Sequence, residues 1–277
     1  RDAAGFSALA RAAQVGDVPL VTLLLSKGAD VTLATHENQN TPLLWAAGSN
    51  HVDIVRLLLA YKAAPDTQRN VQGDTALLWA CRGGANEAVS ALLDAAPQLL
   101  GLMNRIGMSC LICAAAGGHS ATLKLLISWL GAGPAGLLDA RDKFGRTALH
   151  FASATDNGAA ASVSLLLDAR ADWRARDTNG LTPLGEATKA GCLGAARLLQ
   201  RAWESEISSD EISPDGSPVP GASLRGASLR DAGSADGVAS DGRCGGRCGE
   251  PPAEPACRRR QRGAGGGRQR GARQQGA

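Results

Sequence analysis

The chain has 277 residues, of which 20% are charged, with 29 lysines and arginines against 26 aspartates and glutamates. The formal net charge of +3 is too small to indicate that the molecule as a whole binds a polyanion. No apolar run approaches the roughly 18 residues that a membrane span requires. The seven cysteines are too scattered for a disulfide framework, so we expect a reducing compartment, the cytoplasm or the nucleus.

Six segments of similar sequence follow one another from the N-terminus, as in TPLLWAA and TALLWAC. They begin, in chain order, at Ser7, Thr41, Thr75, Ser109, Thr147 and Thr182, and the first four starts are 34 residues apart. A fixed period of this size indicates a repeat solenoid. In such a fold each unit buries its apolar face only against its neighbours.

Each segment is predicted to form two short helices separated by a tight break. The Ser or Thr at its start can cap the unpaired amides of the first helix. Pro42 and Pro183 follow at the first helical position, where a missing N–H costs nothing. Gly16, Gly84 and Gly118 mark the break, because glycine adopts a positive φ easily. Apolar residues then recur at helical spacing, as in IVRLLL of the second copy.

The Thr-Pro-Leu-x-x-Ala-Ala start, the Gly or Asn at the break, the Val-x-x-Leu-Leu second helix and the trailing KGADV resemble the ankyrin repeat. The resemblance covers residues 2–203 and implies an all-α solenoid of stacked helix–turn–helix units with finger loops. The expected repeats are residues 2–34, 36–68, 70–102, 104–138, 142–174 and 177–203.

Four departures from the family pattern mark where the repeats are expected to differ. Gln39 replaces the finger glycine of repeat two, and Gly185 replaces the usual His of repeat six. Repeat three ends in DAAPQLL instead of the expected Gly-Ala-Asp, so its following loop is expected to be reshaped. Repeat five carries ATDNGAAAS, which lengthens the turn between its helices.

No motif in the chain predicts catalysis, a cofactor or a metal site. His51, His119 and His150 fall where ankyrin repeats commonly carry structural histidines, and His150 is expected to support its turn by hydrogen bonding. CLIC at 110–113 has the spacing of zinc and redox sites, but no second Cys or His pair matches it, which favours core packing. GAGPAG at 131–136 lacks the preceding strand of a dinucleotide site.

The resemblance implies that partners contact variable finger residues and the exposed face of the first helices. The expected partner-binding residues are Phe6, Glu37, Asn40, Asp74, Arg82, Arg105, Met108, Lys143, Phe144, Arg146, Leu181 and Lys189; Val71 and Ile106 lie at neighbouring variable positions. Acidic residues on the early fingers and basic ones on the later fingers predict a partner segment of opposite polarity. Trp45 and Trp79 recur in register, and we favour core packing for them over a ligand platform.

Residues 204–277 are predicted to be a disordered, low-complexity tail. No aromatic residue follows Trp203, residues 204–218 are acidic and Ser-rich, and residues 257–277 contain seven arginines and no acid. Such a segment cannot bury enough apolar surface to offset the entropy of ordering. Its Arg/Gly-rich end could bind RNA or another polyanion weakly. A solvated tail and a weakly selected product of GC-rich codons are the alternatives.

These features predict a non-catalytic, monomeric scaffold that binds a partner protein on the concave face and finger loops. The alternative is the regulatory array of a larger enzyme, such as a kinase, ubiquitin ligase or palmitoyltransferase, with its catalytic domain outside this chain. Because Arg1 already lies inside a repeat, we expect the chain to be a fragment.

Overall fold

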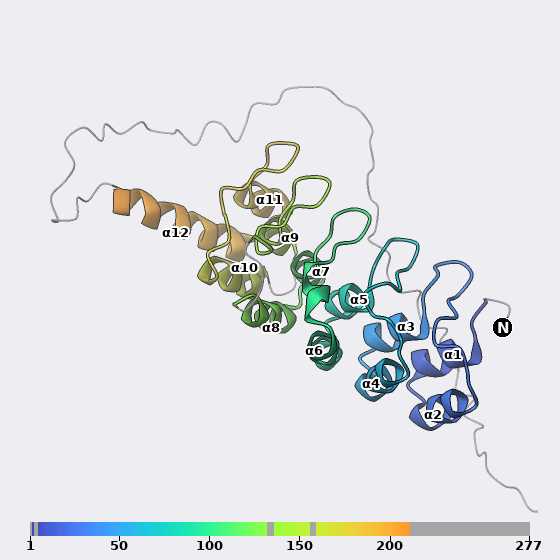
Figure 1. The fold of residues 1–277 in the computed structure, drawn as a ribbon. Helices are drawn as coiled ribbons and strands as arrows, with labels where there is room; N and C mark the ends of the chain where they lie inside the picture. The colour runs from blue at the N-terminus through green and yellow to red at the C-terminus, as the bar shows by residue number, and fades with distance from the viewer. Residues whose placement is uncertain (1, 3–4, 132–135, 156–158, 211–277) are drawn as a thin grey trace, which may run out of the picture. The chain divides into compact units, whose positions relative to one another are not determined.

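The structure, a computed structural model, describes residues 2, 5–131, 136–155 and 159–210, and only the backbone of 159 and 206–210. Within these ranges it contains twelve α-helices, one short 3-10 helix and no β-strand. The α-helices form six consecutive pairs, and the loop ahead of each inner helix from α3 onward projects beyond the helices on one side (Figure 1). The predicted all-α solenoid of six units is confirmed.

The helix pairs form two layers. The inner helices are α1 (Ala8–Val15), α3 (Pro42–Gly48), α5 (Ala76–Gly83), α7 (Cys110–Ala116), α9 (Ala148–Ala154) and α11 (Pro183–Ala190). The outer helices are α2 (Val18–Ser26), α4 (Val52–Ala60), α6 (Asn86–Ala95), α8 (Ser120–Leu130), α10 (Ala159–Asp168) and α12 (Leu193–Asp210). Each inner helix packs against the next inner helix, and each outer helix against the next outer helix.

The core runs continuously between the two layers. Leu44, Leu78 and Ile112 of the inner helices and Ile54 and Leu92 of the outer helices are completely buried. Burying each such side chain contributes about 1.5–3 kcal/mol relative to leaving it in water. Neighbouring repeats place buried side chains at equivalent helix positions, so each unit completes the core of its neighbour.

Small residues let the inner helices approach one another closely. A Cβ added to Gly83 of α5 would lie 2.9 Å from the carbonyl oxygen of Gly48 of α3. Trp45 is 6% exposed, which confirms core packing for this residue, whereas Trp79 is partly exposed. The ring of Trp79 covers Gly48, whose added Cβ would lie 3.0 Å from it.

The predicted caps form in five of the six repeats. The side chains of Ser7, Thr75, Ser109 and Thr182 each accept a hydrogen bond from a first-turn amide. Thr147 and His150 form a reciprocal capping box. The prediction is wrong for Thr41, which keeps the extended backbone of an N-cap but makes no side-chain cap bond.

The breaks and the reshaped loop follow the sequence pattern. Gly16, Gly84 and Gly118 have φ values of 88°, 70° and 72°, as predicted. Gln39, at a finger-glycine position, has a φ of 54°, which is uncommon for a residue with a Cβ. The loop after repeat three contains the 3-10 helix η1 (Pro97–Gly101), so it is reshaped as expected.

The last helix corrects the predicted start of the tail. Helix α12 continues through residues 204–210, which were expected to be disordered. Trp203 packs on Trp173, with ring centroids 5.7 Å apart, and the Gln200 amide donates to Glu204 Oε1 at 3.1 Å. These contacts extend the helix beyond the last repeat motif. The remaining tail, with its polyanion prediction, the GAGPAG segment at 132–135 and the repeat-five turn at 156–158 lie outside the described residues.

Candidate binding surface on the finger loops and inner helices

The finger loops are built around an Asn or Asp at their base. One side-chain oxygen of Asn104, Asp142 and Asp177 accepts hydrogen bonds from the amides two and four residues further along, at 2.8 to 3.1 Å. This arrangement mimics a backbone turn and fixes the loop locally. Burial alone would raise the pKa of Asp177, but the amides of Leu181 and Asn179 outweigh it, and its pKa is lowered from 3.8.

Consecutive fingers are joined by main-chain hydrogen bonds. The amide after each base residue donates to a carbonyl of the preceding finger. The pairs are Val71 to Asn38 at 3.0 Å, Arg105 to Gln72 at 3.0 Å, Lys143 to Ile106 at 2.9 Å and Thr178 to Phe144 at 2.9 Å. Fingers two to six therefore have fixed relative positions. A partner that binds across them does not have to order them first.

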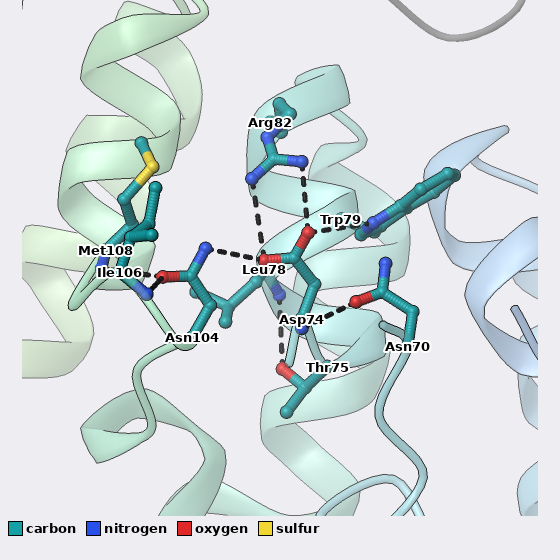
Figure 2. A network of polar contacts seen from close by, with 9 residues as sticks. All are labelled: Asn70, Asp74, Thr75, Leu78, Trp79, Arg82, Asn104, Ile106 and Met108. Carbon is teal, nitrogen blue, oxygen red and sulfur yellow. Dashed lines mark hydrogen bonds and ion pairs between the residues drawn. The ribbon is translucent and has the colours of Figure 1, made fainter. Parts of the chain in front are cut away.

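The carboxylate of Asp74 is the centre of a buried polar network (Figure 2). It accepts hydrogen bonds from Trp79 Nε1 at 3.2 Å, Arg82 Nη1 at 3.1 Å and Asn104 Nδ2 at 2.8 Å. Asn104 belongs to the next finger, so the network ties repeat three to repeat four. Because Arg82 compensates its charge, Asp74 is paired within the fold.

A second carboxylate holds Arg146 in repeat five. Asp142 Oδ2 accepts from Arg146 Nε at 3.0 Å and Nη2 at 2.8 Å. The guanidinium carbon lies 5.0 Å from the ring centroid of Phe144 and 4.3 Å from that of Phe151. Cation–π contacts at this distance are favourable. Arg146 therefore supports the exposed ring of Phe144 from within the array.

Aromatic rings form a row across the first three repeats. The guanidinium of Arg11 lies 3.9 Å from the ring centroid of Phe6, and Phe6 and Trp45 are 5.2 Å apart. Trp45 and Trp79 follow at 5.5 Å in an edge-to-face arrangement. Such pairs stabilise beyond their buried area, so this row links the N-terminal repeats.

The structure divides the expected partner-binding residues into three groups. Exposed residues are Glu37, Arg105, Lys143, Phe144 and Lys189, and partly exposed ones are Phe6, Arg82, Arg146 and Leu181. Asn40, Asp74 and Met108 are 0%, 0% and 4% exposed, so the expectation that they contact a partner is wrong. Each of them follows the left-handed finger residue, where the chain turns back onto its own inner helix.

The burial of Asp74 also weakens the predicted charge polarity, because of the two acids that carried it only Glu37 is exposed. Asp2 on finger one is exposed as well, but it is paired with Arg11. Val71 and Ile106, at neighbouring variable positions, are 39% and 42% exposed and belong to the surface. Sequence reasoning missed the cross-repeat role of Asn104. The recurrence of Asn at positions 70 and 104 is the signal that could have revealed it.

His150 and the two cysteines of the CLIC segment have structural roles. His150 Nδ1 accepts from the Thr147 amide at 3.2 Å, and its Nε2 lies 3.1 Å from the carbonyl oxygen of Leu181, which confirms the predicted support of the turn. Cys110 and Cys113 are buried, in agreement with core packing. Among the described residues, no group of three or more His, Cys, Asp or Glu side chains could hold a metal ion.

A pocket of about 490 Å³ lies between the stems of fingers two and three. Its walls are mainly hydroxyl and amide side chains, including Thr35, Thr41, Gln39 and Gln68. His36 also lines the pocket. In the part of the chain that the structure describes, no helix is long and apolar enough to cross a membrane.

Comparisons with known proteins agree with this geometry. A family model described as ankyrin repeats (3 copies) matches residues 9–101, 62–134, 93–177 and 111–210. None of the curated proteins matches the sequence.

Several solved structures are similar to the chain. One is a chain of the complex between the Bd0816 predatory endopeptidase from Bdellovibrio bacteriovorus and the immunity protein Bd3460, with 27% identity and a TM-score of 0.60 over 71% of this chain and 98% of that one. The ankyrin repeat protein EF0377 gives 29% identity and a TM-score of 0.60 over 72% and 98%. An ankyrin repeat domain (ABAYE2397) from Acinetobacter baumannii gives 28% and 0.57 over 70% and 96%.

Proposed function

The chain belongs to the ankyrin-repeat family, and from this premise we propose that its array is a non-catalytic module that binds a partner protein through the finger loops and inner helices. Ankyrin repeats are generally protein-binding modules. The family indicates the class of function. The surface residues of this chain must determine which partner protein it binds.

The observation that carries the proposal is a run of exposed apolar side chains on neighbouring, hydrogen-bonded fingers. Val71, Ile106 and Phe144 are 39%, 42% and 52% exposed. Their backbones lie in one ladder of inter-finger bonds. Exposed apolar groups on a rigid frame favour association, because burying them releases water without a large ordering cost. One of the similar chains belongs to an endopeptidase–immunity protein complex, which agrees with a role in protein binding.

Site-specific photo-crosslinking of the full 277-residue chain tests the proposal. A photoreactive phenylalanine analogue replaces Val71, Ile106 or Phe144 on the fingers, and Arg56 or Lys124 on the outer helices as matched exposed controls. We expect the finger positions alone to crosslink a discrete protein in cell lysate, in competition with unmodified chain. Equal crosslinking from the outer helices, or none from the fingers, would contradict the proposed surface.

A further inference from the structure

Near the tips of fingers three to five, the acidic side chains are buried and basic side chains are exposed. Of the four acids in these loops, Asp74 and Asp142 are 0% and 6% exposed and are paired with Arg82 and Arg146. Asp66 and Asp139 are partly exposed and lie further from the finger tips. Arg105 and Lys143 are exposed, and no described residue forms an ion pair with either side chain. The tips of fingers four and five therefore expose cations, while the acids beside the tips, Asp74 and Asp142, are buried.

The exposed cations lie beside exposed apolar side chains. Arg105 precedes Ile106, and Lys143 precedes Phe144, so two neighbouring fingers repeat a cation followed by an apolar residue. Finger three adds Val71, which is 39% exposed. We call these five residues the finger ridge.

Contacts with the rest of the array fix the position of the ridge. The amide of Lys143 donates to the carbonyl of Ile106 at 2.9 Å, which fixes finger five against finger four. Phe144 is supported by Arg146, whose guanidinium is bound in turn by the buried carboxylate of Asp142. A rigid aromatic side chain beside a cation is a common energetic centre of interfaces.

We infer that the finger ridge binds an extended, acidic protein segment that carries apolar side chains. This inference rests on the proposed function and adds the chemistry of the partner. Carboxylates on the segment complement Arg105 and Lys143, and its apolar side chains pack on Ile106 and Phe144.

The dimensions of the ridge favour an extended segment. Packed helices are about 8–10 Å apart, and an extended chain rises about 3.3 Å per residue, so roughly three residues of the segment correspond to one finger. A nucleic acid fits the ridge less well. Binding a phosphate backbone requires many cations, whereas the ridge offers Arg105 and Lys143. Phe144 is its one aromatic side chain, and successive bases would need several such rings to stack on.

A displayed library of random 12-residue peptides, selected on the immobilised full chain, tests the inference. Enriched sequences are then made as fluorescent peptides, and their Kd is measured with three proteins. These are the natural chain, the double variant R105E/K143E, and the control R56E/K124E, which reverses two exposed charges on outer helices. Circular dichroism confirms that the variants keep the helical content of the natural chain.

We expect the natural chain to enrich peptides with net negative charge and apolar residues. At low salt, R105E/K143E should bind these peptides at least about tenfold more weakly, because each attractive charge pair becomes a repulsive one. R56E/K124E should bind them as the natural chain does. The difference should shrink as salt is added. Enrichment of neutral or basic peptides, no enrichment, or equal binding by R105E/K143E would overturn the inference. The finger crosslinks remain the separate test of the proposed function.

Discussion

Asp74 and Arg82 form an ion pair in which the carboxylate is completely buried and the guanidinium side chain is 33% exposed, with Nη1 and Oδ2 3.1 Å apart. Repeat two, 34 residues earlier, has Asn40 and Gly48 at the same two positions. Charge and countercharge are thus present together in repeat three and absent together in repeat two. A buried carboxylate needs its cation, whereas a neutral amide does not.

A double-mutant cycle tests this coupling. Arg82→Ala should lower the free energy of unfolding by about 2–3 kcal/mol, because it leaves a buried charge without a cation. Asp74→Asn should cost less, about 1–2 kcal/mol, since the amide still accepts from Trp79 and Arg82 can turn to solvent. The combined variant should cost less than the sum of the two, as measured by urea denaturation. Strict additivity would show that the pair is not coupled.

Gln39 is expected to destabilise its finger through its backbone. Its φ of 54° is unfavourable for a residue with a Cβ, and the other finger-loop residues at this position are glycines. Gln39→Gly should therefore raise the free energy of unfolding by about 0.5–1 kcal/mol. Glu37→Gly, in the same loop without a positive φ, is the control and should be neutral or destabilising. If both variants lose stability equally, the strain at Gln39 is not significant.

Because of His150, the free energy of unfolding should fall as the pH drops below about 6.5. Burial lowers its pKa from 6.5, and its Nδ1 accepts the Thr147 amide, which requires the neutral ring. The unfolded chain then binds more protons than the folded chain, so stability falls as pH drops from 6.5 toward the folded pKa. His150→Gln should be less stable at pH 7 but should lose less on acidification, measured by thermal unfolding at several pH values. Parallel pH profiles of the two proteins would contradict this assignment.

The buried thiols should be unreactive in the folded chain. Burial raises the pKa of Cys81 well above 9.0 and that of Cys113 to about 12, and both side chains are completely buried. The thiolate, which is the reactive form, is therefore scarce at neutral pH. In a variant with Cys244, Cys248 and Cys257 changed to Ser, a thiol reagent should label the remaining cysteines only along the urea unfolding transition. Rapid labelling of the folded variant would reject core packing for the CLIC segment.

The sequence predicted the helices better than the surface. The period of 34 residues located the helix pairs. Thr75 is correctly predicted as a cap and His150 as a support of its turn, because these roles depend on a few residues close in sequence. The orientation of finger side chains depends on the next repeat. Asp74 is buried because Asn104, Trp79 and Arg82 surround it, while the acidic Glu37 is exposed. Charge along the chain therefore did not indicate charge on the surface.

The last helix ends later than the amino-acid composition suggests, because tertiary packing stabilises it. The segment after Trp203 is polar and acidic, which suggested disorder. Helix α12 nevertheless continues to Asp210, since Trp203 packs on Trp173. Tertiary packing therefore contributes to a helix whose own sequence is a weak helix former.

The most direct test of the account is the affinity of the crosslinked partner for finger-tip variants of the full chain. Val71, Ile106 and Phe144 are each changed to Ser in one protein, and the exposed outer-helix residues Arg56 and Lys124 are changed to Ser in the control. We expect the finger variant to bind roughly 100-fold more weakly, about 1 kcal/mol for each apolar anchor, and the control to keep its affinity. Equal affinity of both variants, with unchanged helical content, would show that the fingers do not carry recognition.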